Sequence, residues 1–390
     1  MQTDCQQHTN RYSAWLVVVF SVAVTAVAGR LVGLGYLGFA IMLPLLVMPQ
    51  PSRLRASVIA VSYYLAAGAD ILQVDSYLKA THSAIPPAVF LAAAAPLQSV
   101  AWAVCWSRRP RPLCTSAALL VSALPPLGVL GWAHPFHAAG ILFPTFGIVG
   151  LLLMLVLLEL AAFEHLTRMA LPFVALTASL IPAATRPAPP SWAGVETRYG
   201  DVFTYDDPLS IMEAVEREAR LNPASVLVWP ESTVGHWNQA TELFWAPVIH
   251  DARVRGKTLI FGSTVAIPDP SRTCYRNVVL FKGREEPSPV DQRTPVPAAM
   301  WQPASGGGVP LNPLSSPIRE IAGQRAVFLI CYEQLLVWSY LPLLFDRPDL
   351  LVGLANVYWV EGSSIPAVQT ACLRSWAHLF DIPFIQAVNQ

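Results

Sequence analysis

The sequence predicts a polytopic α-helical membrane domain over residues 1–185, a short linker at 186–191, and an α/β domain over 192–390. Three observations carry this prediction. The 390-residue chain is 54% hydrophobic and only 13% charged, whereas about 25% of the residues of an average soluble domain are charged. The charged residues are unevenly distributed along the chain, with 14 in residues 1–185 and 36 in the remainder. Long apolar runs fill the first part, and short apolar runs alternating with amphipathic stretches fill the second.

Seven apolar stretches are candidates for membrane-spanning helices, each of which needs about 20 mostly apolar residues. They are 14–29, 31–48, 56–74, 85–106, 113–132, 139–163 and 169–184. With a cytoplasmic N-terminus, two basic residues, Arg30 and Lys79, fall outside the cytoplasm, and seven fall inside it: Arg11, Arg53, Arg55, Arg108, Arg109, Arg111 and Arg168. This bias predicts that the α/β domain lies outside the cytoplasm.

Charge and cysteine patterns exclude several classes of function. Residues 1–185 carry a net charge of +4 and the rest carry −4, so neither part has the basic excess that binding to nucleic acid requires. Six cysteines at unrelated spacings exclude a small disulfide scaffold, and no Cys-x-x-Cys pair suggests zinc. We therefore expect no metal, no cofactor and no nucleic-acid partner. Asp70 lies inside the third candidate span, where a carboxylate either has a function or sits at the membrane interface.

Strand and helix signals alternate after the linker, which is typical of a layered α/β domain. Helices are expected at 207–223, 240–255 and 364–380, and strands at 225–232, 257–265, 276–283, 326–333, 349–356 and 383–389. Asp207 or Ser210 is a candidate N-cap for the first helix. Lys282 and Gly283 are expected to form a hairpin turn.

Two of these strands end in residues suited to nucleophilic catalysis. Glu231 follows the apolar run at 225–229, and Cys331 follows the run at 326–330. Ligand sites in open α/β sheets lie beyond the carboxyl ends of strands, where a cysteine can act as a nucleophile and a carboxylate can accept its proton. Each residue alone has a structural alternative, because buried cysteines commonly serve only packing.

The letters around these two residues resemble a known superfamily. VWPEST (228–233) and ICYE (330–333) look like the glutamate and nucleophile motifs of the nitrilase, or carbon–nitrogen hydrolase, superfamily. Placed behind a multi-span domain, they resemble bacterial apolipoprotein N-acyltransferases. YRN (275–277), AN…W (355–359) and the terminal PFIQAVN follow in family order. Within this family the sequence is similar to a branch that serves conjugal plasmid transfer.

This resemblance implies a fold, a reaction and a location. The fold would be an α-β-β-α sandwich, and the site a Glu–Lys–Cys triad. Cys331 would be the nucleophile that takes an acyl group from a phospholipid as a thioester, Glu231 the general base, and Glu333 a supporting carboxylate. An amine on a protein would then accept the acyl group. The chain would lie in the bacterial inner membrane, with the α/β domain in the periplasm.

The lysine of the triad is where the sequence departs from the family. The corresponding stretch, QRTPVPAAM (292–300), places Gln292 in the lysine position, with Arg293 one residue out of register as the candidate substitute. The three lysines of the chain, Lys79, Lys257 and Lys282, all lie elsewhere. Removal of one oxyanion donor typically costs about 2.7–4 kcal/mol in transition-state stabilisation, so the departure bears directly on activity.

Three interpretations remain open. The first is an acyl- or amide-processing enzyme of conjugal transfer that uses Arg293. The second is a catalytically degenerate component that supports assembly of the mating-pair or pilus apparatus, with conjugation proteins as partners. The third is an unrelated membrane protein. Acyltransferase members of the family continue into a last transmembrane helix, whereas this sequence stops at Gln390; either it is truncated or its branch is anchored only through the N-terminal part.

Overall fold

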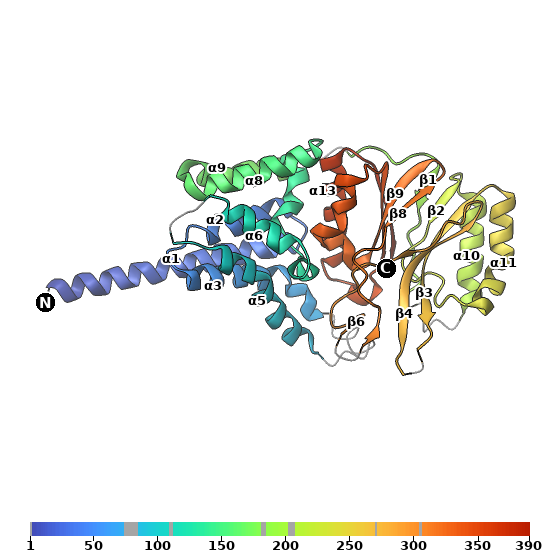
Figure 1. The fold of residues 1–390 in the computed structure, drawn as a ribbon, viewed down its shortest axis with the longest axis horizontal. Coiled ribbons are helices and arrows are strands. Elements are labelled where there is room, and N and C mark those ends of the chain that lie inside the picture. The colour runs from blue at the N-terminus through green and yellow to red at the C-terminus, as the bar shows by residue number, and fades with distance from the viewer. Residues whose placement is uncertain are drawn as a thin grey trace.

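A computed structural model describes residues 2–73, 85–108, 112–180, 185–201, 207–269, 271–303 and 306–390. Residues 2–180 form a group of helices, here called the helical part. Residues 185–390 form two β-sheets with flanking helices, here called the sandwich. The two lie side by side, with α13 of the sandwich nearest the helical part (Figure 1).

The helical part is built mainly of short helices. In chain order they are α1 (Gln2–Val32), η1 (Leu37–Ile41), α2 (Met42–Val47), α3 (Arg53–Ala67), η2 (Ala69–Gln73), α5 (Pro87–Cys105), α6 (Cys114–Ala123), η3 (Leu127–Leu130), η4 (Pro135–Ala138), α7 (Ala139–Leu142), α8 (Gly147–Phe163) and α9 (His165–Leu180). Turns that contain glycine or proline separate many of them, because these residues interrupt a helix.

These breaks change the predicted spans. Within the described ranges, one helix, α5, is long and apolar enough to cross a membrane, or two if a bent pair counts as one span. The prediction of seven spans is therefore not confirmed. The expected span at 139–163 is not one continuous helix, because the chain bends by 116° between Leu142 and Gly147 and Thr145 in the break has φ 67°. The expected span at 31–48 is divided among α1, η1 and α2.

Some sequence predictions fall on residues outside the described ranges. They are Lys79, Arg109, Arg111 and the last part of the seventh candidate span, 181–184. The described part of that span lies in α9, which begins earlier than expected, at His165.

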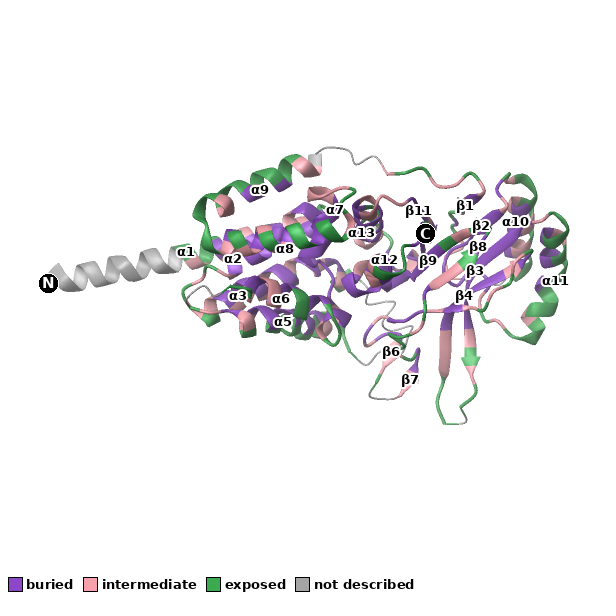
Figure 2. Cartoon of the chain, turned by 45° about the horizontal axis from the view of Figure 1, so that its top comes forward, coloured by how far each residue is buried: buried purple, intermediate pink, exposed green. Residues whose placement is uncertain are grey.

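The helices of the helical part carry apolar side chains on their outer surfaces. Large exposed hydrophobic residues follow one another along α1, α5, α8 and α9, and Figure 2 shows the exposed surface of α8 and α9 in green. On α8 they are Ile148, Val149, Leu152, Leu153, Val156, Leu160 and Phe163. A continuous exposed apolar surface of this kind needs a non-aqueous or protein environment.

The sandwich contains eleven strands and four α-helices in its described ranges. The elements are β1 (Trp192–Gly194), α10 (Pro208–Leu221), β2 (Val226–Val228), α11 (Gln239–Val254), β3 (Thr258–Ile267), β4 (Cys274–Gly283), β5 (Val290–Asp291), β6 (Trp301–Gln302), β7 (Gly307–Gly308), β8 (Ile318–Ile321), β9 (Gln324–Ile330), η5 (Cys331–Leu335), η6 (Val337–Tyr340), α12 (Leu341–Phe345), β10 (Leu350–Asn356), η7 (Tyr358–Val360), α13 (Ile365–Phe380) and β11 (Phe384–Asn389).

These strands form two sheets. The first has the order β1-β2-β3-β4-β7-β6, with β5 on β4, and the second has the order β11-β10-β9-β8. Strands β1, β2 and β3 are parallel, as are β9, β10 and β11, so their carboxyl ends share an edge within each sheet. Both candidate catalytic residues follow strands of these parallel sets.

Alternating side chains along the strands fill two different cores, since successive residues of a strand point to opposite faces. Val226 and Val228 face the second sheet, while Leu227 faces α10 and α11. Across the two sheets, Phe281 and Phe328 pack edge to face with ring centroids 5.2 Å apart. The layer order is therefore helix, sheet, sheet, helix, which confirms the α-β-β-α prediction.

The outer face of the second sheet is covered by α13 and then by the helical part. One continuous core runs from β9 and β10 through α13 into helices of residues 32–175. Within it the rings of Tyr340 and Trp376 stack at 4.7 Å, and Trp376 donates to His137 of η4 at 2.9 Å. The linker at 186–191 therefore joins two parts that share a hydrophobic core.

Most predicted elements of the sandwich are present. Asp207 is the N-cap of α10 and accepts from the backbone N–H of Ser210. The hairpin prediction is wrong: Lys282 and Gly283 are the last residues of β4, paired with β3, and six residues separate them from β5. The strand continues there because Leu259 and Thr258 of β3 supply its hydrogen-bonding partners.

Candidate active site

Cys331 stands at a sharp turn between a strand and a helix. It directly follows β9 and begins η5, with φ 50°, in the left-handed region that non-glycine residues rarely adopt. Its side chain is buried. Strained turns of this kind recur at nucleophile positions because they project the side chain beyond the sheet edge.

Glu231 lies in the loop that follows β2, on the neighbouring sheet. The loop is also strained, since Ser232 has φ 63°. Strand β3 passes so close that a Cβ at Gly262 would stand 2.3 Å from the Glu231 Cα atom. Glycine at 262 therefore allows the buried carboxylate to reach the space between the two sheets.

Three donors converge on the Glu231 carboxylate. The Asn277 side chain donates to Oε1 at 2.6 Å, and the backbone N–H of Asn356 donates to Oε2 at 3.1 Å. The Cys331 thiol also hydrogen-bonds this carboxylate. The Asn389 side chain in turn donates to the Asn356 side chain at 2.9 Å. The structure thus brings Glu231 and Cys331 together, as their positions in the sequence predicted.

Burial sets the protonation of this pair. Desolvation raises the pKa of Glu231, and hydrogen bonds from Asn277 and Cys331 oppose that rise. Desolvation also raises the pKa of the Cys331 thiol well above its ordinary 9.0, and the nearby Glu231 charge raises it further. The resting pair is therefore a protonated thiol next to a carboxyl group whose raised pKa makes it a stronger base than an ordinary glutamate.

Gln292 and Arg293 are adjacent in sequence and buried, but their side chains contact different partners. The Gln292 side chain donates to the Ile330 carbonyl at 3.2 Å and accepts from Asn277 at 3.0 Å. The Arg293 guanidinium donates to the Ser339 carbonyl at 2.8 Å and stacks over Trp338. Arg293 is not among the residues that line the cavity beside Cys331. Its role as a substitute for the lysine therefore stays a prediction without a supporting contact.

The two lysines in the described ranges, Lys257 and Lys282, bind partners away from Cys331. Lys257 donates to the backbone carbonyls of Asn222 and Ala224. Lys282 pairs with Glu242 at 2.9 Å. No lysine in the described part of the chain contacts the thiol.

Glu333 organises the backbone around the nucleophile. Its carboxylate accepts the backbone N–H of Ile330 at 2.9 Å, of Arg293 at 2.8 Å and of Thr294 at 3.2 Å. The Arg293 Nε lies 3.4 Å from the same carboxylate. Burial raises the pKa of Glu333, and the Arg293 charge and the backbone donors oppose that rise. Glu333 therefore fixes the turn that carries Cys331 to the loop at 293–294.

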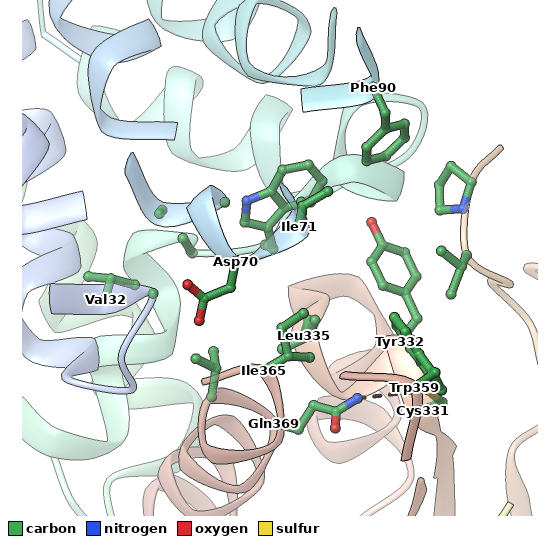
Figure 3. A pocket seen from close by; sticks show the side chains of 18 residues that line it. Val32, Asp70, Ile71, Phe90, Cys331, Tyr332, Leu335, Trp359, Ile365 and Gln369 are labelled. Carbon is green, nitrogen blue, oxygen red and sulfur yellow. Dashed lines mark hydrogen bonds between the residues drawn. The ribbon is translucent and has the colours of Figure 1, made fainter. Parts of the chain in front are cut away.

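An apolar cavity opens beside Cys331, at the contact between the sandwich and the helical part (Figure 3). Its volume is about 110 Å³. The helical part contributes apolar walls from α1, α3, η2 and α5, and the sandwich contributes η5, η7, α13 and the loop at 296–297. Apart from Cys331, the polar side chains on its walls include Asp70, Tyr332 and Gln369.

Two residues of the site are not among the candidate site residues that the sequence predicts. Asn277, which donates to Glu231, belongs to the YRN stretch (275–277), where the sequence by itself assigns it no role. Gln369 on α13 points its amide toward Cys331, with Nε2 3.9 Å from Sγ (Figure 3). A glutamine on an amphipathic helix gives no sequence signal of its own, so only the packing of α13 over β9 reveals it.

Proteins with similar sequences identify the family of this chain. Conjugal transfer protein TraB of Agrobacterium fabrum is 32% identical over 97% of this chain and 94% of its own length. Probable conjugal transfer protein TraB of Sinorhizobium fredii is 30% identical over 93% of this chain and 97% of its own. The chain belongs to the TraB family. No family model matches the sequence of this TraB-family chain.

Solved structures offer weaker likenesses to this TraB-family chain. An amidase from Nesterenkonia sp. is 14% identical with a TM-score of 0.29, over 42% of this chain and 63% of the amidase. A glutamine-dependent NAD+ synthetase from Acinetobacter baumannii is 13% identical with a TM-score of 0.29, over 42% of this chain and 31% of the synthetase. Because these scores are low, the fold rests on the observed layer order.

The buried Arg293–Glu333 pair predicts a large stability effect. Removing one partner of a buried ion pair leaves the other charge uncompensated and typically costs about 3–5 kcal/mol. We expect Arg293→Gln to lower the free energy of unfolding by this amount, measured by chemical denaturation of the purified protein. The matched control is Arg253→Gln, which breaks an exposed pair with Glu286 and should cost about 1 kcal/mol at most. Equal losses in the two variants would contradict the assignment.

The Glu231–Cys331 contact predicts that Glu231→Gln speeds alkylation of the thiol but slows any reaction that uses Glu231 as a base. In Glu231→Gln the negative charge that raises the pKa of the thiol is gone, so the pKa of Cys331 falls. We expect iodoacetamide to alkylate Cys331 faster in this variant at pH 8, as followed by peptide mass spectrometry. Any reaction that needs Glu231 as a base should slow by about 10²–10⁴-fold. Unchanged alkylation would show that the carboxylate does not act on the thiol.

Proposed function

We propose that this chain acts in conjugal plasmid transfer as a membrane-anchored enzyme that transfers an acyl group through a thioester on Cys331. The observation that carries the proposal is the position of Cys331. Its thiol contacts a buried carboxylate on one side and the apolar cavity on the other. The conjugal role is taken from the printed names of the two TraB relatives.

The first half of the proposed reaction is acylation of the cysteine. Cys331 Sγ attacks the carbonyl carbon of an ester, such as a phospholipid, while its proton passes to Glu231. The carbonyl π electrons move to oxygen, and a C–S bond forms. When this intermediate collapses, the ester C–O bond breaks and the departing alcohol takes the proton from Glu231. The products are a thioester on Cys331 and a free alcohol.

The second half returns the enzyme to its starting state. An amine attacks the thioester carbon and loses a proton to Glu231. The C–S bond then breaks, and the sulfur regains that proton. The net change is an ester and an amine converted to an amide and an alcohol, with no redox partner required. Glu231 is suited to both steps because burial places its pKa above that of an ordinary glutamate.

The cavity favours an acyl chain as the group transferred. Its walls beside Cys331 include Ile71, Phe90, Leu335 and Val368, and it is enclosed partly by the helical part. Burying a methylene group in such a space yields about 0.8 kcal/mol. An acyl chain of several carbons therefore gains binding energy here that a small polar amide would not.

A specific observation also favours the catalytically degenerate alternative. The lysine position holds Gln292, which is neutral and hydrogen-bonded to Asn277 and Ile330. The raised pKa of Cys331 keeps the thiol protonated at rest. In that alternative the sandwich would support the conjugation apparatus without turning over a substrate.

Thioester formation distinguishes the two functions. Protein purified from native membranes and incubated with phospholipid, without an amine acceptor, should gain the mass of a fatty acyl group on Cys331. Hydroxylamine should remove it, because it cleaves thioesters, and Cys331→Ser should not form a hydroxylamine-labile adduct. Absence of the adduct in the unaltered protein would contradict acyl transfer and favour the degenerate component.

We also propose that the helical part is embedded in the bacterial inner membrane, with the N-terminus in the cytoplasm and the sandwich in the periplasm. The exposed apolar surfaces of α1, α5, α8 and α9 support embedding. The basic residues support the orientation, since Arg53 and Arg108 lie together near the end of α5 remote from the cavity. Phe90, near the other end of α5, lines the cavity against the sandwich.

Two matched cysteine substitutions test this topology. Leu314 in the sandwich and Leu113 beside α6 are both exposed, at 95% and 68%. A membrane-impermeant maleimide added to intact cells should label Leu314→Cys but not Leu113→Cys. Permeabilised cells should give labelling of both, and the parent protein measures the background of native cysteines. Equal labelling in intact cells, or release of the protein by alkaline carbonate, would contradict the proposed topology.

A further inference from the structure

We propose that the Gln369 side-chain amide is the hydrogen-bond donor that stabilises the Cys331 sulfur and the oxyanion of the tetrahedral intermediate bonded to that sulfur. This inference rests on the proposed acyl transfer and identifies a catalytic residue for that reaction. Gln369 is on α13, far in sequence from the position where the related superfamily carries its lysine. Its amide reaches the same sulfur from the cavity side.

The geometry brings the donor close to the reacting atoms. Gln369 Nε2 lies 3.9 Å from Cys331 Sγ, and the side chain lines the cavity and points toward the sulfur (Figure 3). An oxygen on the carbon bonded to Sγ extends away from the sulfur into that cavity. It can therefore approach Nε2 to the 2.7–3.1 Å or so that oxyanion donors adopt.

The Gln369 amide is buried, and its oxygen atom accepts no hydrogen bond from the described part of the protein. Gln369 is 2% exposed, and its Oε1 atom has no hydrogen-bond partner in the described structure. A buried carbonyl oxygen without a partner costs about 1–3 kcal/mol. This cost is difficult to explain for a purely structural glutamine, but it fits a side chain that awaits a ligand in the cavity.

Other polar groups near the site are already engaged. Gln292 donates to Ile330, and the Arg293 guanidinium donates to Ser339. The Asn356 backbone N–H is shared between Glu231 and the sulfur. Gln369 is thus the side-chain amide that faces both the sulfur and the cavity in the described residues.

The first turn of α13 is held in place by the helical part. Ser364, which precedes the helix, donates its backbone N–H to Asp70 at 2.7 Å, and its hydroxyl contacts Asp70 and the Gly33 carbonyl. Arg30 donates to the other Asp70 oxygen at 2.6 Å. This network fixes the helix that carries Gln369 relative to η5 and Cys331.

Single-turnover acylation tests the inference with p-nitrophenyl octanoate as the probe. Release of p-nitrophenolate in the first turnover reports formation of the C–S bond. We expect Gln369→Met and Gln369→Glu, which keep the size but cannot donate in the same way, to slow this step by about 10²–10³-fold. The matched control is Gln386→Ala, which removes a nearby glutamine bonded to Thr370 and Gln334 rather than to the sulfur; it should stay within about twofold.

A second readout separates a donor from a packing residue. Loss of the donor should move the pH dependence of Cys331 alkylation by iodoacetamide to higher pH in Gln369→Met, whereas Gln386→Ala should leave it unchanged. A first turnover in the parent protein that Gln369→Met retains would overturn this inference alone. A parent protein with no first turnover, and none of the thioester described above, would overturn the proposed function and this inference together.

Discussion

The burial of one carboxylate governs the arrangement of the whole site. Glu231 is placed between two sheets, where an unpaired charge would cost several kcal/mol, so each surrounding segment must supply a donor. Strand β4 supplies Asn277, the end of β10 supplies the backbone of Asn356, and the turn after β9 supplies Cys331. Because Gly262 of β3 has no side chain, the backbone of the loop that carries Glu231 can pass close to this strand. The α-β-β-α architecture is what allows segments of three strands from two sheets to meet at the two oxygens of this carboxylate.

A second buried carboxylate has a different task. Glu333 binds three backbone N–H groups and Arg293, and so holds the turn that carries Cys331 in its strained conformation. The two carboxylates divide the work: one contacts the thiol, and the other shapes the backbone around it. Arg293 is therefore better understood from its contacts as the counter-ion of Glu333 than as a replacement for a catalytic lysine.

The sequence predicted much of the sandwich and only part of the site. Strands such as 326–330 were recognisable because they are short, wholly apolar and end in residues suited to chemistry, and the pairing of Glu231 with Cys331 followed from parallel strand ends. Gln369 could not be predicted, because its role depends on how α13 packs over β9. The seven spans are not confirmed, since hydropathy does not register the breaks at Gly35 and Thr145, where the backbone leaves helical geometry.

The core shared by the two parts has a consequence for how this molecule can be divided. A fragment that began after the linker would keep both sheets, yet it would expose Trp376 of α13, which is buried and donates to His137 of the helical part. It would also lose one wall of the cavity and the Asp70 carboxylate that anchors Ser364. The cavity beside Cys331 is thus formed jointly by the helical part and the sandwich, and neither part encloses it alone.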